Sequence, residues 1–333
     1  MIQEADVLLK VEQLTKYFPV KGGIFGKKTL QQVKAVDGIS FEIKRGETFG
    51  IVGESGCGKS TAGRAIMRLL EPTSGDVHFE GVNLSKLDKN EMRKMRKDIQ
   101  IVFQDPFASL NPRMRVYDII EEPLINFEMG DKKERKVRVH EVAEQVGLTI
   151  AQLSRLPHEF SGGQRQRIGI ARALVTKPKL IIADEPVSAL DVSIQSQVLN
   201  LMRDLQKEFG LTYIFISHDL SVVKHFCDRI GVMYLGKMVE ITNKHDLYDD
   251  PLHPYAKSLL SALPTSHPLQ VKERIILEGD VPSPSNPPSG CTFHPRCFAC
   301  MDVCKTVAPT LQEVKSNHFV SCHLFEEEGV KSG

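Results

Sequence analysis

The 333-residue sequence has no tryptophan, almost no net charge and no long apolar run. A formal net charge of +1 excludes an overall basic field for gripping nucleic acid, although a local patch could still exist. Its most apolar segments, 179–183 and 211–216, are far shorter than the roughly 18–20 residues needed to span a bilayer. We therefore expect no membrane-spanning helix.

The N-terminal segment also lacks the pattern of a secretory signal. Residues 1–9 carry Glu4 and Asp6, and no basic region leads into an apolar stretch. We expect a protein of cytosolic topology. If such a protein works at a membrane, it does so by docking onto something that spans the membrane.

Cysteine is scarce except near the C-terminus. Cys57 and Cys227 stand alone, and the other five are Cys291, Cys297, Cys300, Cys304 and Cys322. In a reducing cytosol, such a cluster favours metal or iron–sulfur ligation over disulfides.

The apolar pattern predicts strands that alternate with helices. This rhythm is typical of a doubly wound, mainly parallel sheet. We expect a tight hairpin turn at residues 44–47 and a helical insert within 106–166, where apolar residues recur at helical spacing. The strands are expected at 7–18, 36–43, 48–52, 77–79, 99–103, 179–183 and 211–217, and helices at 59–70 and 193–209.

A glycine-rich segment between an expected strand and an expected helix fits the pattern G-x-x-x-x-G-K-S/T. Its glycines allow backbone N–H groups to converge on phosphate oxygens, and the helix adds its positive end. Lys59 would place a charge on the β- and γ-phosphates, and the Ser60 hydroxyl would bind Mg²⁺. The predicted ATP-binding loop is Gly53, Glu54, Ser55, Gly56, Cys57, Gly58, Lys59, Ser60 and Thr61.

Polar side chains follow three other expected strands. Asp184 and Glu185 end a buried strand, at the sheet edge where α/β proteins bind ligands. Asp184 would hold Mg²⁺ and Glu185 would act as general base toward water. Gln104 could bind Mg²⁺ and sense the γ-phosphate, and His218 could hydrogen-bond that phosphate.

The segment Ser161-Gly162-Gly163-Gln164 resembles the signature motif of ATP-binding cassette (ABC) ATPases, with Phe160 in place of its usual leucine. The phosphate loop, Gln104, the acidic pair and His218 resemble that family in order. The resemblance implies a P-loop NTPase fold of RecA type, with an antiparallel β-subdomain and an inserted helical subdomain. It also implies a second anion site at Ser161, Gly162, Gly163 and Gln164, which completes the ATP site of another cassette.

Two further positions are carried over from the family. Phe18 resembles the aromatic residue that stacks on adenine, and Tyr17 is the less favoured occupant. Segment 188–191 resembles the D-loop, which makes Asp191 a nucleotide-site residue. We predict an α/β core at 1–105 and 167–250, a helical signature subdomain at 106–166 and a C-terminal extension at 251–333.

Segments 33–41 and 104–113 and the Pro-rich tail resemble the ATPases of oligopeptide and dipeptide permeases, over essentially the full length. The match favours the second of the two paired ATPase subunits. This implies a peripheral protein on the cytoplasmic face of the inner membrane, with a paralogous ATPase subunit, two integral membrane subunits and, indirectly, an extracytoplasmic peptide-binding protein as partners. No nucleic-acid partner is expected. A nickel or metal-complex importer, a soluble non-transport ABC ATPase and a regulator without turnover are the alternatives.

The resemblance extends to the cysteine tail. It implies a 4Fe–4S cluster held by Cys291, Cys297, Cys304 and Cys322. Four thiolates suit such a cluster, and Cys300 is an alternative ligand. Zinc, with His294 or His323 as an added ligand, and plain reduced thiols stay open as well.

Overall fold

The computed structural model describes residues 6–22, 28–263 and 274–326. In these ranges, no helix combines the length and the apolarity needed to cross a membrane. The chain divides into two compact units. The first comprises Met1–Leu8, Ile43–Thr48 and Phe79–Ser217, and the second Leu9–Glu42, Phe49–His78 and His218–Gly333. The predicted division into an α/β core, a helical subdomain and a C-terminal extension follows motifs and not these two units, and it stays a prediction.

The first unit is built on three parallel strands. The strand β7 (Leu180–Asp184) lies between β6 (Ile99–Val102) and β8 (Thr212–Ser217), with Leu180 opposite both Ile99 and Thr212. Every residue of β7 and β8 is buried, as expected for strands covered on both faces. The predicted parallel sheet is confirmed.

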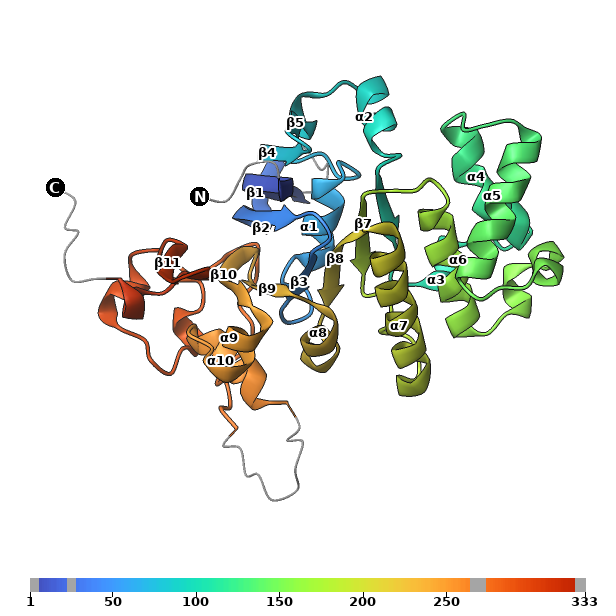
Figure 1. Cartoon of the computed structure of the whole chain (residues 1–333). Helices are drawn as coiled ribbons and strands as arrows, with labels where there is room; N and C mark the ends of the chain where they lie inside the picture. Colours follow the sequence, from blue (N-terminus) through green and yellow to red (C-terminus); the bar gives the residue numbers. More distant parts are fainter. Residues whose placement is uncertain (1–5, 23–27, 264–273, 327–333) are drawn as a thin grey trace, which may run out of the picture. The chain divides into compact units, whose positions relative to one another are not determined.

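Helices occupy most of the rest of the first unit. In Figure 1, α4 (Val116–Asn126), α5 (Lys132–Gln145) and α6 (Gly162–Leu174) lie side by side, and each packs on the other two. The helix α5 begins at a capping box, in which Asp131 and Glu134 bond to each other's backbone N–H groups. The other elements are α2 (Lys89–Met95), α3 (Pro106–Ser109), α7 (Val192–Phe209) and 3-10 turns at Leu84–Lys86, Ile150–Ser154 and Pro157–Glu159.

The sheet of the second unit mixes both strand directions. The strands β3 (Thr48–Val52) and β9 (Arg229–Tyr234) are parallel, and β10 (Lys237–Asn243) returns antiparallel to β9. Two tail strands continue this sheet: β12 (His318–Val320) pairs with β10, and β11 (Gln312–Lys315) pairs with β12. The helices are α1 (Lys59–Ile66), α8 (Leu220–Phe226), α9 (Lys244–Asp249) and α10 (Pro254–Ser261), with 3-10 turns at His294–Arg296, Asp302–Lys305 and His323–Phe325.

A separate antiparallel sheet holds the N-terminal strands. In the second unit, β1 (Val7–Gly22) lies between β2 (Lys28–Lys44) and β4 (Ser74–Phe79); β5 (Val82–Asn83) follows β4 along the chain. The antiparallel β-subdomain is thereby confirmed. The hairpin predicted at residues 44–47 is wrong: a tight turn is present, with Glu47 N–H donating to the Lys44 carbonyl at 3.2 Å, but β2 and β3 belong to different sheets.

A buried carboxylate fastens the C-terminal strands to the second unit. Glu240 on β10 is completely buried and lies 2.7 Å from Nε2 of His318 on β12. Its two oxygens also accept the backbone N–H groups of Leu252 and His253 at 2.9 and 2.8 Å. One side chain therefore binds three donors from two other segments of the chain, as burial of a charge requires.

We predict that Glu240→Ala lowers the free energy of unfolding by about 3–5 kcal/mol, because it leaves three buried donors without their acceptor. Urea unfolding followed by circular dichroism would measure the loss. Lys315→Ala is the matched control, since it breaks only a solvent-exposed ion pair with Asp250, and exposed pairs contribute little to stability. Equal losses in the two variants would contradict the anchoring role of Glu240.

Candidate functional site

The glycine-rich loop follows β3 in the second unit, and its glycines are required by close packing. Gly53 has φ 153°, and a Cβ there would lie 2.2 Å from the carbonyl oxygen of Met233. Gly58 has φ 107°, and its Cβ would lie 2.0 Å from the carbonyl oxygen of Ala35. Any side chain would displace the backbone of a neighbouring strand or loop.

Lys59 is the first residue of α1, and its ammonium group lies inside the loop. Nζ donates to the carbonyl oxygens of Gly53 and Glu54 at 2.8 and 3.0 Å, and lies 3.9 Å from Sγ of Cys57. The residue is only 4% exposed. The loop therefore wraps around a buried positive charge that is held by its own backbone.

The other loop residues follow the predicted order. Ser55 and Gly56 are exposed at the turn, and Cys57 is buried, where loss of solvent raises the pKa of its thiol. Ser60 and Thr61 lie in the first turn of α1, which begins directly after Gly58. The loop thus presents backbone N–H groups at a helix N-terminus, an arrangement that suits an anion.

Glu54 is attached to the C-terminal part of the chain. Its carboxylate accepts two hydrogen bonds from Arg296, at 2.8 and 3.1 Å, and its N–H donates to the hydroxyl of Tyr255 at 2.9 Å. Sequence reasoning missed both partners. They are 242 and 201 residues away along the chain, and no local pattern marks them.

The two aromatic candidates near the end of β1 have different surroundings. The Tyr17 hydroxyl donates to Asp37, and burial, reinforced by this carboxylate, raises the pKa of Tyr17 to about 12. Phe18 is half-buried and packs beneath the ammonium of Lys16, at 5.1 Å from the ring centroid. Tyr17 is thus held by its hydroxyl, and Phe18 stays the predicted adenine contact.

In the first unit, the structure brings Gln104 and Glu185 together. The amide of Gln104, two residues after β6, donates to the Glu185 carboxylate at 2.7 Å. Glu185 itself has φ 47°, a left-handed conformation that is uncommon for a glutamate, and its N–H donates to the carbonyl of Ile216 at 2.9 Å. Strain of this kind at a polar strand end is typical of functional sites.

Two other predicted residues lie at strand ends. Asp184 is the last residue of β7 and is 1% exposed. His218 directly follows β8, is exposed, and precedes Asp219, whose carboxylate caps α8. Their positions agree with the expected carboxyl edges of the strands.

The segment Ser161–Gln164 begins α6 with a reciprocal cap. Ser161 Oγ accepts the Gln164 N–H at 3.4 Å, and the Gln164 side chain accepts the Ser161 N–H at 3.0 Å. Phe160 is buried, as expected for an apolar anchor, while Ser161 is exposed. The start of this 13-residue helix therefore presents a positive end at the surface.

The glycines of this segment lie against the neighbouring loop and α7. A Cβ on Gly163 would be 2.4 Å from Cγ2 of Ile194, and one on Gly162 would be 3.3 Å from Leu190. Asp191 directly precedes α7 and is exposed. The predicted signature and D-loop residues therefore form one contiguous surface in the first unit.

In the cysteine tail, Cys304 and Cys322 are buried, Cys291 and Cys297 half-buried, and Cys300 exposed. Burial, with the neighbouring thiols as a further cause, raises the pKa of Cys297 and of Cys322 to about 11. The donor atoms suit iron or zinc. Among the described residues, however, no three His, Cys, Asp or Glu side chains are arranged to hold a metal ion. The predicted iron–sulfur ligation is thus not supported by this arrangement.

The two histidines considered as zinc ligands are already engaged. Both ring nitrogens of His323 have partners, the Val307 carbonyl at 2.9 Å and the Glu326 carboxylate at 2.5 Å. Nδ1 of His294 lies 2.9 Å from the Cys291 carbonyl. A metal bound by His323 would have to displace one of these two partners from its ring nitrogen.

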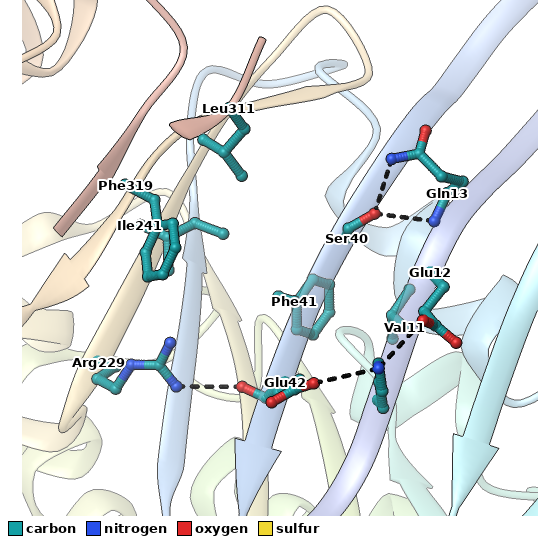
Figure 2. A pocket seen from close by; sticks show the side chains of 11 residues that line it. Val11, Glu12, Gln13, Ser40, Phe41, Glu42, Arg229, Ile241, Leu311 and Phe319 are labelled. Carbon is teal, nitrogen blue, oxygen red and sulfur yellow. Dashed lines mark hydrogen bonds and ion pairs between the residues drawn. The ribbon is translucent and has the colours of Figure 1, made fainter. Parts of the chain in front are cut away.

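The second unit also contains a cavity of about 520 Å³ (Figure 2). Its charged groups are paired with one another: Lys10 with Glu12 and Glu42 at 3.1 and 3.5 Å, and Arg229 with the Glu42 carbonyl at 3.1 Å. None of the predicted site residues lines it. Its walls are Lys10, Val11, Glu12, Gln13, Ser40, Phe41, Glu42, Arg229, Ile241, Leu311 and Phe319.

Comparison with protein families gives two matches. Residues 36–188 match the family described as ABC transporter. Residues 239–304 match the family described as the C-terminal region of oligopeptide/dipeptide transporters. The first match includes the phosphate loop, Gln104, the signature segment and the acidic pair, and the second includes Cys291, Cys297, Cys300 and Cys304.

Curated relatives match over nearly the whole chain. The chain is 58% identical to the oligopeptide transport ATP-binding protein AppF of Bacillus subtilis, over 96% of this chain and 98% of that protein. It is 56% identical to the putative oligopeptide transport ATP-binding protein YkfD of the same organism, over 97% of each chain.

Solved structures share the fold. The cbiO1 protein of Clostridium perfringens, part of the ABC transporter complex cbiONQ, matches with a TM-score of 0.63 and 32% identity over 74% of this chain and 92% of that one. The dimeric ATP-binding cassette MJ0796, in a post-hydrolysis state with ADP and Pi, matches with the same TM-score and identity, over 71% of this chain and 99% of its own.

Proposed function

The chain belongs to the ABC transporter family, as an ATPase related throughout its length to oligopeptide transport ATP-binding proteins, and from this we propose that it powers an importer of dipeptides or oligopeptides. The observation that carries this proposal is the match of its C-terminal region to that of oligopeptide/dipeptide transporters, beyond the general ATPase domain. The named relatives favour peptides over the nickel-importer and soluble-ATPase alternatives.

In this proposal, the loop 53–61 binds the phosphates of ATP. Lys59 contributes the charge that faces the β- and γ-phosphates, and the N–H groups at the start of α1 add donors. The hydroxyl, amide and carboxylate oxygens of Ser60, Gln104 and Asp184 fit the preference of Mg²⁺ for oxygen ligands, and these residues would hold it. Bound Mg²⁺ would neutralise charge on the phosphate oxygens.

Glu185 acts as general base in this scheme. Its backbone is fixed in a left-handed conformation, and Gln104 orients its carboxylate. The carboxylate takes the proton of the attacking water. His218, at the end of β8, supplies a hydrogen bond to the γ-phosphate, and Phe18 stacks on the adenine.

A second cassette would complete each ATP site. The start of α6, where Ser161 is exposed, has the N–H groups of Gly162 and Gly163 between the capping residues Ser161 and Gln164 and no lysine of its own, and Asp191 is exposed nearby. We assign this surface to the ATP held by a paralogous subunit. The dimeric state of the related cassette MJ0796 with ADP and Pi supports this arrangement.

We place the chain on the cytoplasmic face of the inner membrane, bound to two integral membrane subunits that receive peptide from an extracytoplasmic binding protein. The docking surface we propose lies in the first unit, where a cavity of about 390 Å³ is lined by residues of α2 and of the end of α4. Arg93 spans the two helices through the Asn126 carbonyl at 2.7 Å, and Lys94 and Lys97 are exposed beside Phe127. This surface suits a short membrane-subunit helix with acidic residues.

For the cysteine tail, we propose that Cys291, Cys297, Cys304 and Cys322 take up a 4Fe–4S cluster after their side chains rearrange. The support is that two of them are joined through the backbone, where the Cys291 N–H donates to the Cys304 carbonyl at 2.8 Å. Cys300 is exposed on the same segment and is the alternative ligand. No catalytic step depends on this cluster.

We predict that Glu185→Gln retains ATP binding but lowers the hydrolysis rate at least ~10²-fold, because the base is lost while the shape of the side chain is kept. Phosphate release by the purified chain measures turnover. Glu313→Gln, a change at an exposed glutamate of β11, is the control. In cells that lack the chain, uptake of labelled peptides should return with the control and not with Glu185→Gln. Near-normal turnover of the variant, or nickel uptake restored in place of peptide uptake, would contradict the assignment.

Charge reversal at Lys94 and Lys97 should weaken docking. We expect the double variant Lys94→Glu, Lys97→Glu to bind the membrane subunits at least ~10-fold less well, since like charges would face each other. Quantitative pull-down from membranes measures this loss, and the ATPase rate of the isolated chain should stay unchanged. The double variant Lys133→Glu, Lys136→Glu at exposed positions of α5 provides the same charge change elsewhere in the unit. Equal recovery with both variants would place the docking surface elsewhere.

Protein purified without oxygen should contain about four iron atoms per chain and absorb in the visible range. Cys322→Ser should abolish both signals, and Cys300→Ser should leave them intact because the exposed Cys300 is not one of the four proposed ligands. A colourless sample with zinc would favour tetrahedral zinc. A sample free of both metals would leave reduced thiols as the state of the tail.

A further inference from the structure

Two residues of the C-terminal region are bound to the phosphate loop at a single position. Arg296 donates through both terminal nitrogens to the two oxygens of Glu54, at 2.8 and 3.1 Å. The hydroxyl of Tyr255 accepts the N–H of the same residue at 2.9 Å. Side chain and backbone of Glu54 are therefore both held from beyond residue 250.

These partners are themselves firmly packed. The side chain of Arg296 is 8% exposed and lies 6.0 Å from the ring centroid of Tyr234. Tyr255 is completely buried, and its ring packs on those of Tyr234 and Phe293, with centroids 4.7 and 5.3 Å apart. Such an aromatic cluster fixes where the hydroxyl and the guanidinium lie, so both reach the loop in one geometry.

The position they hold bears directly on Lys59. The Glu54 carbonyl is one of the two that accept the Lys59 ammonium, at 3.0 Å, and Gly53 supplies the other. The Glu54 N–H that Tyr255 accepts belongs to the same peptide group as the Gly53 carbonyl. Tyr255 therefore fixes the backbone that carries both carbonyls bound to Lys59. A bidentate arginine–carboxylate pair adds orientation as well as energy.

Charge gives a second reason for the pair. Glu54 is a carboxylate one residue after Gly53, in the loop to which the proposed function assigns the triphosphate. An unpaired carboxylate there would repel phosphate, and Arg296 cancels its charge at short range. The arginine belongs to the 3-10 turn His294–Arg296, directly before Cys297.

We propose that Arg296 and Tyr255 are positioning residues for the phosphate-binding loop, through which the cysteine-containing extension sets the affinity of the chain for ATP. The inference rests on the proposed function in that ATP is the ligand of the loop. Neither residue contacts the reacting atoms. They act through Glu54 and the carbonyls that hold Lys59.

The test is calorimetric titration of the full-length chain with Mg·ATP, together with steady-state hydrolysis. We expect Arg296→Gln to raise the Kd for ATP roughly tenfold, the effect of losing one charge-assisted pair, with kcat at saturating ATP changed by no more than about twofold. Tyr255→Phe should raise Kd by a smaller factor. Lys305→Gln, which breaks an exposed pair with Asp302 in the same extension, should leave Kd unchanged.

A double-mutant cycle separates positioning from general loosening. In a Glu54→Gln background, Arg296→Gln should change Kd by less than twofold, since the partner charge is already gone. A purely structural anchor would instead lower the unfolding temperature and leave Kd at the wild-type value in every variant. If Arg296→Gln does not fold, Arg296→Lys and Tyr255→Phe carry the same test.

The outcomes distinguish the two proposals. Wild-type chain that binds and hydrolyses ATP, with Arg296→Gln matching Lys305→Gln in Kd, overturns the positioning role and leaves the ATPase intact. Wild-type chain that does not bind ATP overturns the proposed function and this inference together. A raised Kd that vanishes in the Glu54→Gln background supports the positioning role.

Discussion

The buried ammonium of Lys59 is the charge on which the rest of the nucleotide site depends. A charged group that is 4% exposed must have its donors satisfied, and here two backbone carbonyls of the loop accept them. That requirement curls the loop tightly, which in turn brings Gly53 and Gly58 so close to neighbouring backbone that no side chain fits. The glycines and the helix start are therefore both needed to hold the buried charge of Lys59.

In the first unit, hydrogen bonds likewise hold a polar residue in an unusual conformation. Glu185 adopts a backbone conformation that glutamate seldom takes, and it is retained because the Ile216 carbonyl and the Gln104 amide both hold it. In the proposed function, the start of α6 binds an anion as the phosphate loop does, but without a lysine. A helix end with glycines that approach α7 closely leaves donors at the surface, where a partner's nucleotide could meet them.

The C-terminal extension is part of the ATPase and not an appendage. It adds β11 and β12 to the sheet, buries Glu240 beneath His318, and returns through Arg296 to the phosphate loop. Burial in this extension raises the pKa of Cys297 and Cys322 to about 11. Cys297 directly follows Arg296, so a chemical change at this cysteine would occur one residue from a contact with the phosphate loop.

The sequence alone determined the parallel sheet and the order of the motifs, because continuous apolar runs such as 179–183 and the glycine spacing around Lys59 are local signals, whereas the antiparallel subdomain was implied by the family resemblance. It predicted a hairpin at 44–47 that is wrong, since the turn is local but the choice of sheet is not. Tertiary structure alone decided the pairing of Glu54 with Arg296 and Tyr255, and of Glu240 with His318. Those contacts join residues 78 to 242 positions apart, and no short-range pattern encodes which buried charge will meet which partner.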